Sequence, residues 1–353
     1  MTTIPTEPIG SIPRPAYLLQ AMRAYTKDEI SSADLARLYS QATRETIISL
    51  ERTGSPVISD GEQTKPSFAT YPIHGALNLG AGGVVIPFED GHTRQLPVLT
   101  SGPFRYRNFA VDYLREARRH TALPVKQAVI SASAMSLLYP AAGIDGYPQA
   151  QFTADLLDQA ESDIRRCLHE HAYNVQIDFT EARLALKLDP GRGLLQQFIA
   201  LNNQLLGRFT AAERGRIGIH TCPGGDHDST HSADVPYTEL LPLFFQLNAG
   251  NFYLEYAGEK DKVSVLESIK AHIRPGQRVF LGVTDVLAPR IETPEEIRDL
   301  LLQAAEYIPL NQLGSTDDCG FSPFADDVST AREIAFEKIR ARVEGTRLAE
   351  AAL

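Results

Sequence analysis

Short apolar strands alternate with amphipathic helices along almost the whole chain, and this alternation is the feature that most constrains the fold. The expected strands span residues 8–14, 56–62, 125–131, 174–178, 217–222, 251–257 and 278–285, with a last one that ends near Cys319. Between them, apolar residues recur at helical spacing in segments 27–50, 112–120, 153–171, 194–206, 237–247, 262–272 and 293–307. About eight such units predict an α/β fold closed as a (β/α)8 TIM barrel, with an open doubly wound sheet as the alternative.

One long segment interrupts the alternation. Residues 65–108 show no helical periodicity and contain Gly80-Ala-Gly-Gly83 together with two strand-like runs, 84–87 and 96–99. Strand runs separated by turn formers are typical of hairpins. We therefore expect a hairpin insertion after the second strand of the barrel.

The composition indicates one large domain and excludes several functional classes. The chain has 353 residues, of which 43% are apolar, and no linker divides it, so we expect a single domain over residues 1–353. A net charge of −10 argues against binding to nucleic acid or an anionic membrane surface. The sequence has neither a membrane-spanning apolar run nor a signal peptide, so a cytoplasmic location is expected. Three cysteines are too few for a disulfide framework, which leaves them as ligands, nucleophiles or filler.

Polar side chains follow the ends of the predicted strands. In a barrel of this kind, the carboxyl ends of all strands meet at one face, and catalytic residues lie there. The residues in such positions are Ser11, Glu62, Asp178, His220, Cys222, Glu255, Asp285 and Cys319. This arrangement predicts an active site at that face.

Four of these residues have the chemistry of zinc ligands. His220 and Cys222 are two residues apart on a predicted strand, so their side chains share a face. Glu255 and Cys319 follow the ends of two later strands. Imidazole, thiolate and carboxylate are ordinary ligands of tetrahedral Zn²⁺, whereas His220 taken alone could equally be a hydrogen-bonded core residue.

Neighbouring residues leave other metal sites open. His227 and His231 follow Cys222 closely and could replace a ligand or support one. A hard-cation site is a further alternative, although the spacing of a Ca²⁺ loop is absent. Its candidate ligands are Asp226, Asp228, Asp317 and Asp318.

A set of short motifs spread along the chain resembles one known family. The motifs are Ile9-Gly-Ser11, Gly61-Glu62, Val125-Lys126, Ile177-Asp178, His220-Thr-Cys222, Glu255, Gly282-Val-Thr-Asp285 with Pro289-Arg290, and Asp318-Cys-Gly320. Together they resemble the cobalamin-independent methionine synthase family, in its C-terminal, zinc-bearing barrel. The resemblance covers almost the whole chain, while the N-terminal barrel of the full-length family has no counterpart in this sequence.

The resemblance implies specific roles and an activity. Zinc would be held by His220, Cys222, Glu255 and Cys319, with Glu255 the ligand that yields most readily because a carboxylate binds this metal less firmly than a thiolate. Ser11 would meet the carboxylate of an amino thiol such as homocysteine, Glu62 and Asp178 would meet its ammonium group, and Asp285 would be catalytic. The implied enzyme is a zinc-dependent thiol methyltransferase acting on a small-molecule thiol and an alkyl donor; self-association into a homo-oligomer stays open.

Three departures from the family pattern keep other functions open. Leu287 stands where the family has a histidine suited to proton transfer, Phe179-Thr180 replaces Glu-Pro after Asp178, and the chain has no tryptophan. The segment Pro223–His231 resembles a smaller branch whose zinc enzymes open epoxides with coenzyme M. The alternatives are therefore an epoxide-opening thiol alkyltransferase, an enzyme of specialised metabolism, a non-catalytic zinc- or metabolite-binding protein, and a metal-free barrel related to porphyrinogen decarboxylases.

Overall fold

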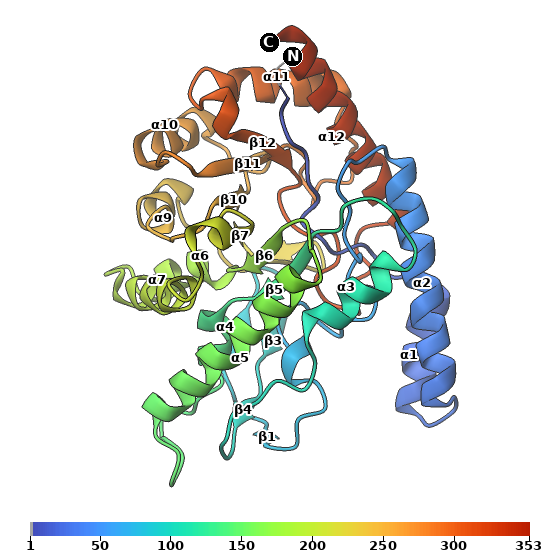
Figure 1. The fold of residues 1–353 in the computed structure, drawn as a ribbon, viewed down its shortest axis with the longest axis vertical. Helices are drawn as coiled ribbons and strands as arrows, with labels where there is room; N and C mark the ends of the chain where they lie inside the picture. The colour runs from blue at the N-terminus through green and yellow to red at the C-terminus, as the bar shows by residue number, and fades with distance from the viewer. Residues whose placement is uncertain (1–2) are drawn as a thin grey trace.

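The computed structural model describes residues 3–353 and has a parallel sheet at its centre (Figure 1). The sheet has six strands in the order β12-β11-β10-β7-β6-β5. Their bounds are β5 Gln127–Ile130, β6 Val175–Asp178, β7 Ile217–Thr221, β10 Asn251–Leu254, β11 Arg278–Gly282 and β12 Leu313–Thr316. Every residue of these strands except Arg278 is buried, as expected when helices cover the outside of a parallel sheet.

Two further extended segments join the edges of this sheet and close the barrel. Thr6 forms a parallel bridge with Ser315 beside β12, and Ile58 forms one with Val125 beside β5. The two segments also contact each other, because the Ile12 N–H donates to the Gly61 carbonyl at 3.0 Å. The predicted (β/α)8 barrel is confirmed, and the open doubly wound sheet is not what the chain forms.

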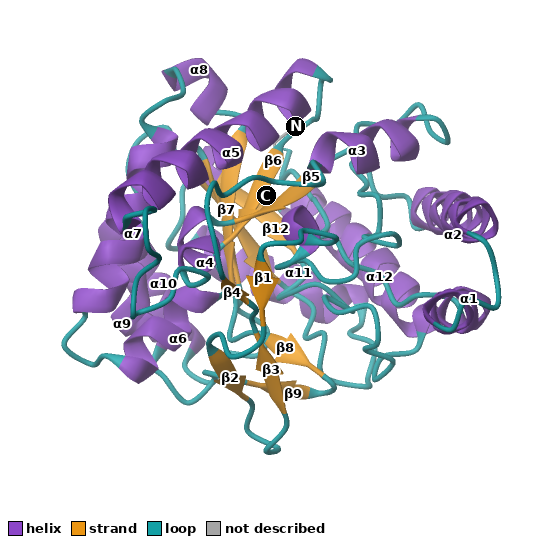
Figure 2. Ribbon diagram, turned by 90° about the horizontal axis from the view of Figure 1, so that it is seen from below, coloured by secondary structure: helices purple, strands orange, loops and turns teal. Residues whose placement is uncertain are grey.

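Helices surround the sheet (Figures 1 and 2). They span α1 Ala16–Thr26, α2 Ser32–Arg52, α3 Ala110–Arg118, α4 Ala132–Ser136, α5 Gln149–His169, α6 Glu181–Leu188, α7 Gly193–Leu206, α8 Ala211–Arg214, α9 Tyr237–Phe244, α10 Lys262–His272, α11 Pro294–Ala305 and α12 Arg332–Ala352, with short 3₁₀ turns at Tyr71–Ile73 and Leu310–Gln312. None of the helices in the described part of the chain is long and apolar enough to cross a membrane.

Local signals decide where individual helices begin. The predicted start of α2 at residue 27 is wrong, because the Ser31 side chain caps the helix by accepting from the Asp34 N–H, in a capping box. The same device begins α11, where Thr293 caps the helix and Pro294 takes its first position. The helices α1, α4, α6, α8 and α12 lie outside the predicted set.

The insertion after the second strand forms two small antiparallel sheets at one end of the barrel (Figure 2). β1 Leu79–Gly80 pairs with β4 Val98–Leu99, and β2 Val85–Pro87 pairs with β3 Thr93–Gln95. A third hairpin, β8 Gly225–Asp226 with β9 Ser229–Thr230, lies nearby. The predicted hairpin insertion is confirmed, and it brings residues of the insertion over the carboxyl ends of the strands.

Candidate metal centre and substrate pocket

A cavity of about 280 Å³ lies between the strand ends and the insertion. Its lining includes Ser11, Glu62, Asp178, His220, Cys222 and Cys319, six of the eight residues singled out from the sequence. The insertion contributes apolar side chains such as Phe88 and Leu96. The cavity thus combines a polar floor with an apolar cover, as small-molecule sites usually do.

The His220 imidazole has one nitrogen held and the other free. His220 lies at the buried end of β7, and its Nδ1 is 3.3 Å from the Tyr253 carbonyl oxygen on β10. A carbonyl can only accept, so Nδ1 carries the proton and Nε2 keeps a lone pair. Nε2 is buried without a hydrogen-bond partner, and a backbone carbonyl on the other ring nitrogen is the support that metal-binding histidines usually have.

Two buried thiols complete a group that could hold a metal ion. Cys222 directly follows β7 and Cys319 lies in the loop after β12, with their Sγ atoms 2.8 Å apart. One ligand atom from each of His220, Cys222 and Cys319 lies within 4.8 Å of the others. Hydrogen bonding from Cys222 acts most strongly on the Cys319 thiol and, against the effect of burial, lowers its pKa well below its ordinary value, while burial raises the pKa of Cys222.

The structure places Glu255, the fourth predicted ligand, outside this group. Its Oε2 accepts from Arg183 Nη1 at 3.0 Å, and Arg183, itself 2% exposed, also binds Glu259 at 2.7 Å. Burial, followed by the nearby charge of Asp318, raises the pKa of Glu255 well above its ordinary value. The Arg183 guanidinium opposes this rise and holds the Glu255 carboxyl group by an ion pair, and coordination by Glu255 stays a prediction.

Asp318 fixes the loop that carries Glu255. Its Oδ1 accepts from the N–H groups of Tyr256 and Ala257, both at 2.9 Å, and its Oδ2 accepts from Gly258 at 2.7 Å. Because Asp318 precedes Cys319 in the chain, this clamp ties the loop after β10 to the loop after β12. The two loops that bear predicted ligands thus hold each other in place.

The three predicted substrate-binding residues lie together in the pocket lining. Asp178 ends β6 and accepts from Gln176 Nε2 at 2.7 Å, and burial raises its pKa to about 7. Glu62 has a positive φ of 54° and forms a buried ion pair with Lys65 at 2.8 Å. Ser11 Oγ accepts from the Ser322 N–H at 3.2 Å. Glu62 is therefore already neutralised in part by a cation of the protein.

Asp285 lies elsewhere. Its Oδ1 accepts from the Leu287 and Ala288 N–H groups at 3.0 and 3.3 Å, so the carboxylate caps its own turn. It is not among the residues that line the pocket. The geometry gives Asp285 a role in shaping the loop after β11, and its predicted role in catalysis stays a prediction.

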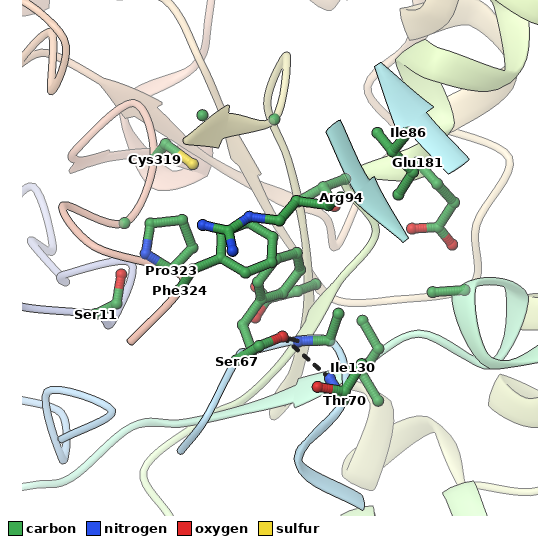
Figure 3. A pocket seen from close by; sticks show the side chains of 18 of the residues that line it. Ser11, Ser67, Thr70, Ile86, Arg94, Ile130, Glu181, Cys319, Pro323 and Phe324 are labelled. Carbon is green, nitrogen blue, oxygen red and sulfur yellow. Dashed lines mark hydrogen bonds between the residues drawn. The ribbon is translucent and has the colours of Figure 1, made fainter. Parts of the chain in front are cut away.

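The insertion supplies a pocket residue that sequence reasoning missed. Arg94 on β3 ion-pairs with Asp226 at 2.5 Å and Asp326 at 2.9 Å, and its guanidinium carbon lies 4.3 Å from the centre of the Phe324 ring. Figure 3 shows Arg94 and Phe324 beside each other in the pocket. Asp226, His227 and Asp327 also form a second group of possible metal ligands, but Asp226 is already neutralised by Arg94. No motif in the sequence identifies these pairs, since their members are far apart in the chain.

Comparison with known proteins places these features in a family. Residues 4–332 match the family model described as the catalytic domain of cobalamin-independent synthase. A methionine synthase from Sulfurisphaera tokodaii is 22% identical over 352 residues, which cover 98% of this chain and 92% of that protein. A 2-hydroxypropyl-CoM lyase from Xanthobacter autotrophicus is 25% identical over 396 aligned positions, which cover 99% of this chain and 96% of the lyase.

Other relatives are longer than this chain. The chain spans 40% of the length of a 5-methyltetrahydropteroyltriglutamate–homocysteine methyltransferase from Nitrosomonas europaea.

Among solved structures, a B12-independent methionine synthase from Shewanella sp. W3-18-1 in complex with selenomethionine has a TM-score of 0.75 and 18% identity, over 99% of this chain and 98% of that one. At this identity the likeness shows a shared fold.

Proposed function

Because the chain belongs to the cobalamin-independent methionine synthase family, we propose that it is a zinc-dependent thiol S-methyltransferase acting on homocysteine or a similar amino thiol. The observation that carries this proposal is the buried group of His220, Cys222 and Cys319 in the wall of the cavity. A location in the cytoplasm, a single domain over residues 1–353 and self-association stay predictions.

The donor set of this group fits zinc. Sulfur ligands are soft and imidazole suits zinc, so two cysteines and one histidine fit the borderline-soft Zn²⁺ ion better than the hard ions Ca²⁺ or Mg²⁺. The unpartnered Nε2 of His220 supplies a lone pair that nothing else in the described residues uses. When bound, zinc would lower the pKa of a substrate thiol and so supply a thiolate nucleophile at neutral pH.

Three protein ligands leave one tetrahedral position for a substrate thiol, as catalytic zinc sites usually do. Arg183 keeps Glu255 away from the group in this structure. We propose that Glu255 is the ligand that exchanges, with Arg183 as its partner when it is not bound to the metal. The exchange would keep the charge of Glu255 balanced in both positions.

The carboxylates of the pocket select the rest of the thiol substrate. Asp178 ends β6, which pairs with β7, and in the register of the two strands Asp178 lies opposite His220. An ammonium group near Asp178 would stabilise its ionised form, which burial otherwise disfavours. Glu62 and Ser11 would orient the same amino acid, Glu62 through the ammonium group and Ser11 through the carboxylate.

The relative that acts on coenzyme M supports a second candidate, an epoxide-opening thiol transferase. A sulfonate-bearing thiol would need a free cation in the pocket. Arg94 is paired with Asp226 and Asp326, and Lys65 is paired with Glu62. Because both cations already have carboxylate partners, the pocket favours a thiol that carries an ammonium group over one that carries a sulfonate.

A product assay separates the candidates. Purified protein is supplied with zinc and either homocysteine plus methyltetrahydrofolate or coenzyme M plus an epoxide, and S-alkylated products are measured by mass spectrometry. We expect methionine from the first mixture and loss of that activity in Cys222→Ser, with Cys167→Ser as the control for a buried cysteine outside the pocket. Alkylated coenzyme M would establish the second candidate instead, and metal binding without either product would favour a non-catalytic protein.

A further inference from the structure

We propose that Glu181 forms a separate subsite in the pocket, whose carboxyl group accepts a hydrogen bond from an N–H group of the alkyl donor. Glu181 is the first residue of α6, it is 7% exposed, and it lines the same cavity as the metal group. The assignment to the donor rests on the proposed function, but the subsite itself rests on the geometry of Glu181.

One oxygen of the Glu181 carboxyl is held and the other is free. Oε1 accepts from the hydroxyls of Ser131 and Ser133, each at 2.5 Å. Oε2 is buried and has no hydrogen-bond partner among the described residues. A buried carboxyl oxygen without a donor is costly, so a free Oε2 in the wall of a cavity indicates a place for a ligand.

Buried side chains around Glu181 hold its carboxyl group in place. Ser131 caps α4 by accepting from the Ala134 N–H, and Asn202 on α7 donates to Ser133 at 2.7 Å. The carboxyl is thereby fixed in one orientation by side chains that are themselves buried. A fixed acceptor discriminates between ligands better than a mobile one, since less order must be gained on binding.

The position of Glu181 suits the donor better than the thiol. Figure 3 shows Cys319 and Ser11 on one side of the pocket and Glu181 with Ile86 on the other. The lining near Glu181 is apolar and comes from β5, α4 and α6, with residues such as Ile130, Met135 and Leu184. The occupant expected there has an apolar body and an N–H group that reaches Oε2.

Burial raises the pKa of Glu181 to about 7, so the charge of the subsite changes near neutral pH. His231 in the same lining has a pKa lowered to about 4 by burial and stays neutral in that range. Arg94 and Arg183 are committed to carboxylates of their own. Asp178 also has a pKa of about 7 and changes charge over the same pH range as Glu181, so a variant must separate the two contributions.

The test measures binding of benzamidine, benzyl alcohol and toluene to the protein without thiol or zinc, by calorimetry or ligand-observed NMR. Benzamidine should bind best, and Glu181→Gln should weaken it by about tenfold to a hundredfold while leaving toluene unchanged. Glu239→Gln, an exposed carboxylate on α9, serves as the matched control and should change neither ligand.

A second arm uses pH. Benzamidine affinity should rise by up to about tenfold per unit between about pH 6 and pH 7 and then level off, and this dependence should shrink in Glu181→Gln. Equal binding of benzamidine to the wild type and to Glu181→Gln would overturn the proposal. Because neither arm requires turnover or metal, a failed methyl-transfer assay leaves this result independent.

Discussion

Replacing Gly320 with alanine should disturb the metal group through a single steric contact. A Cβ built on Gly320 would lie 2.2 Å from Ser11 Oγ, and 3.3 Å from Ser11 Cβ. Both residues are in the pocket lining, and Gly320 directly follows Cys319. The added methyl group must therefore push the Ser11 hydroxyl aside or move the Cys319 loop.

The expected cost has two parts. Forcing a methyl group against the buried Ser11 side chain costs about 1–3 kcal/mol. Displacement of Ser11 Oγ also removes the acceptor of the buried Ser322 N–H, which costs about 1–3 kcal/mol more. Gly320→Ala should thus lower the free energy of unfolding by about 2–6 kcal/mol.

A double-mutant cycle with Ser11→Ala tests this reasoning. Ser11→Ala alone should cost about 1–3 kcal/mol for the lost hydrogen bond. In that background Gly320→Ala should add much less to the loss of stability. The closest remaining contact of the new Cβ is Ser11 Cβ at 3.3 Å, and the Ser322 N–H has already lost its acceptor. Urea denaturation of the four proteins gives the coupling; costs that simply add would refute the steric account.

Two other predictions concern buried charge. Arg183→Met should lower the free energy of unfolding by about 3–5 kcal/mol, because it leaves Glu255 buried without its cation. Glu255→Gln in the same background should restore part of this loss. As a control, Arg192→Met removes an exposed ion pair and should change the free energy of unfolding by less than about 1 kcal/mol. Burial raises the pKa of Glu181 to about 7 and that of Asp163 to about 6, so the folded state holds protons that the unfolded state releases. Stability should therefore fall as pH rises from the unfolded values toward about 7, with a smaller slope in Glu181→Gln; a slope unchanged by that substitution would contradict the raised pKa.

The barrel could be predicted because its pattern is local. Strand and helix periods are written into short windows such as 217–222 and 262–272, and the latter matches α10 Lys262–His272. The helices α1 and α6 lie in segments for which the sequence pattern predicts no element. Their stability depends on packing, of α1 against α2 and of α6 against α7, α9 and β7, which single-sequence patterns do not show.

The metal group was also predictable, but the placement of Glu255 and Asp285 was not. His220 and Cys222 share a strand face, and Cys319 follows a strand end, so the barrel itself brings them together. The orientation of Glu255 depends on Arg183, which lies 72 positions away in the chain. Asp285 instead satisfies the N–H groups of its own turn, a local competition that a motif match does not resolve.

The environment of Glu181 could not be predicted from the sequence either. In the sequence, Glu181 is visible only as a carboxylate shortly after Asp178. Its environment depends on Ser131 and Ser133, which come from the preceding strand–helix unit and lie 50 and 48 positions away. Only the folded chain shows that one oxygen is held and that the other is buried without a hydrogen-bond partner.

Zinc X-ray absorption combined with metal analysis tests the central claim most directly. Purified protein and the Cys319→Ser variant are measured before and after homocysteine is added, with Cys167→Ser as the control. The account predicts stoichiometric zinc with two sulfur ligands and a nitrogen ligand, a further sulfur ligand once homocysteine is present, and severe loss of metal from Cys319→Ser only. Zinc that is absent, retained equally by Cys319→Ser, or unchanged in its ligands by homocysteine would contradict it.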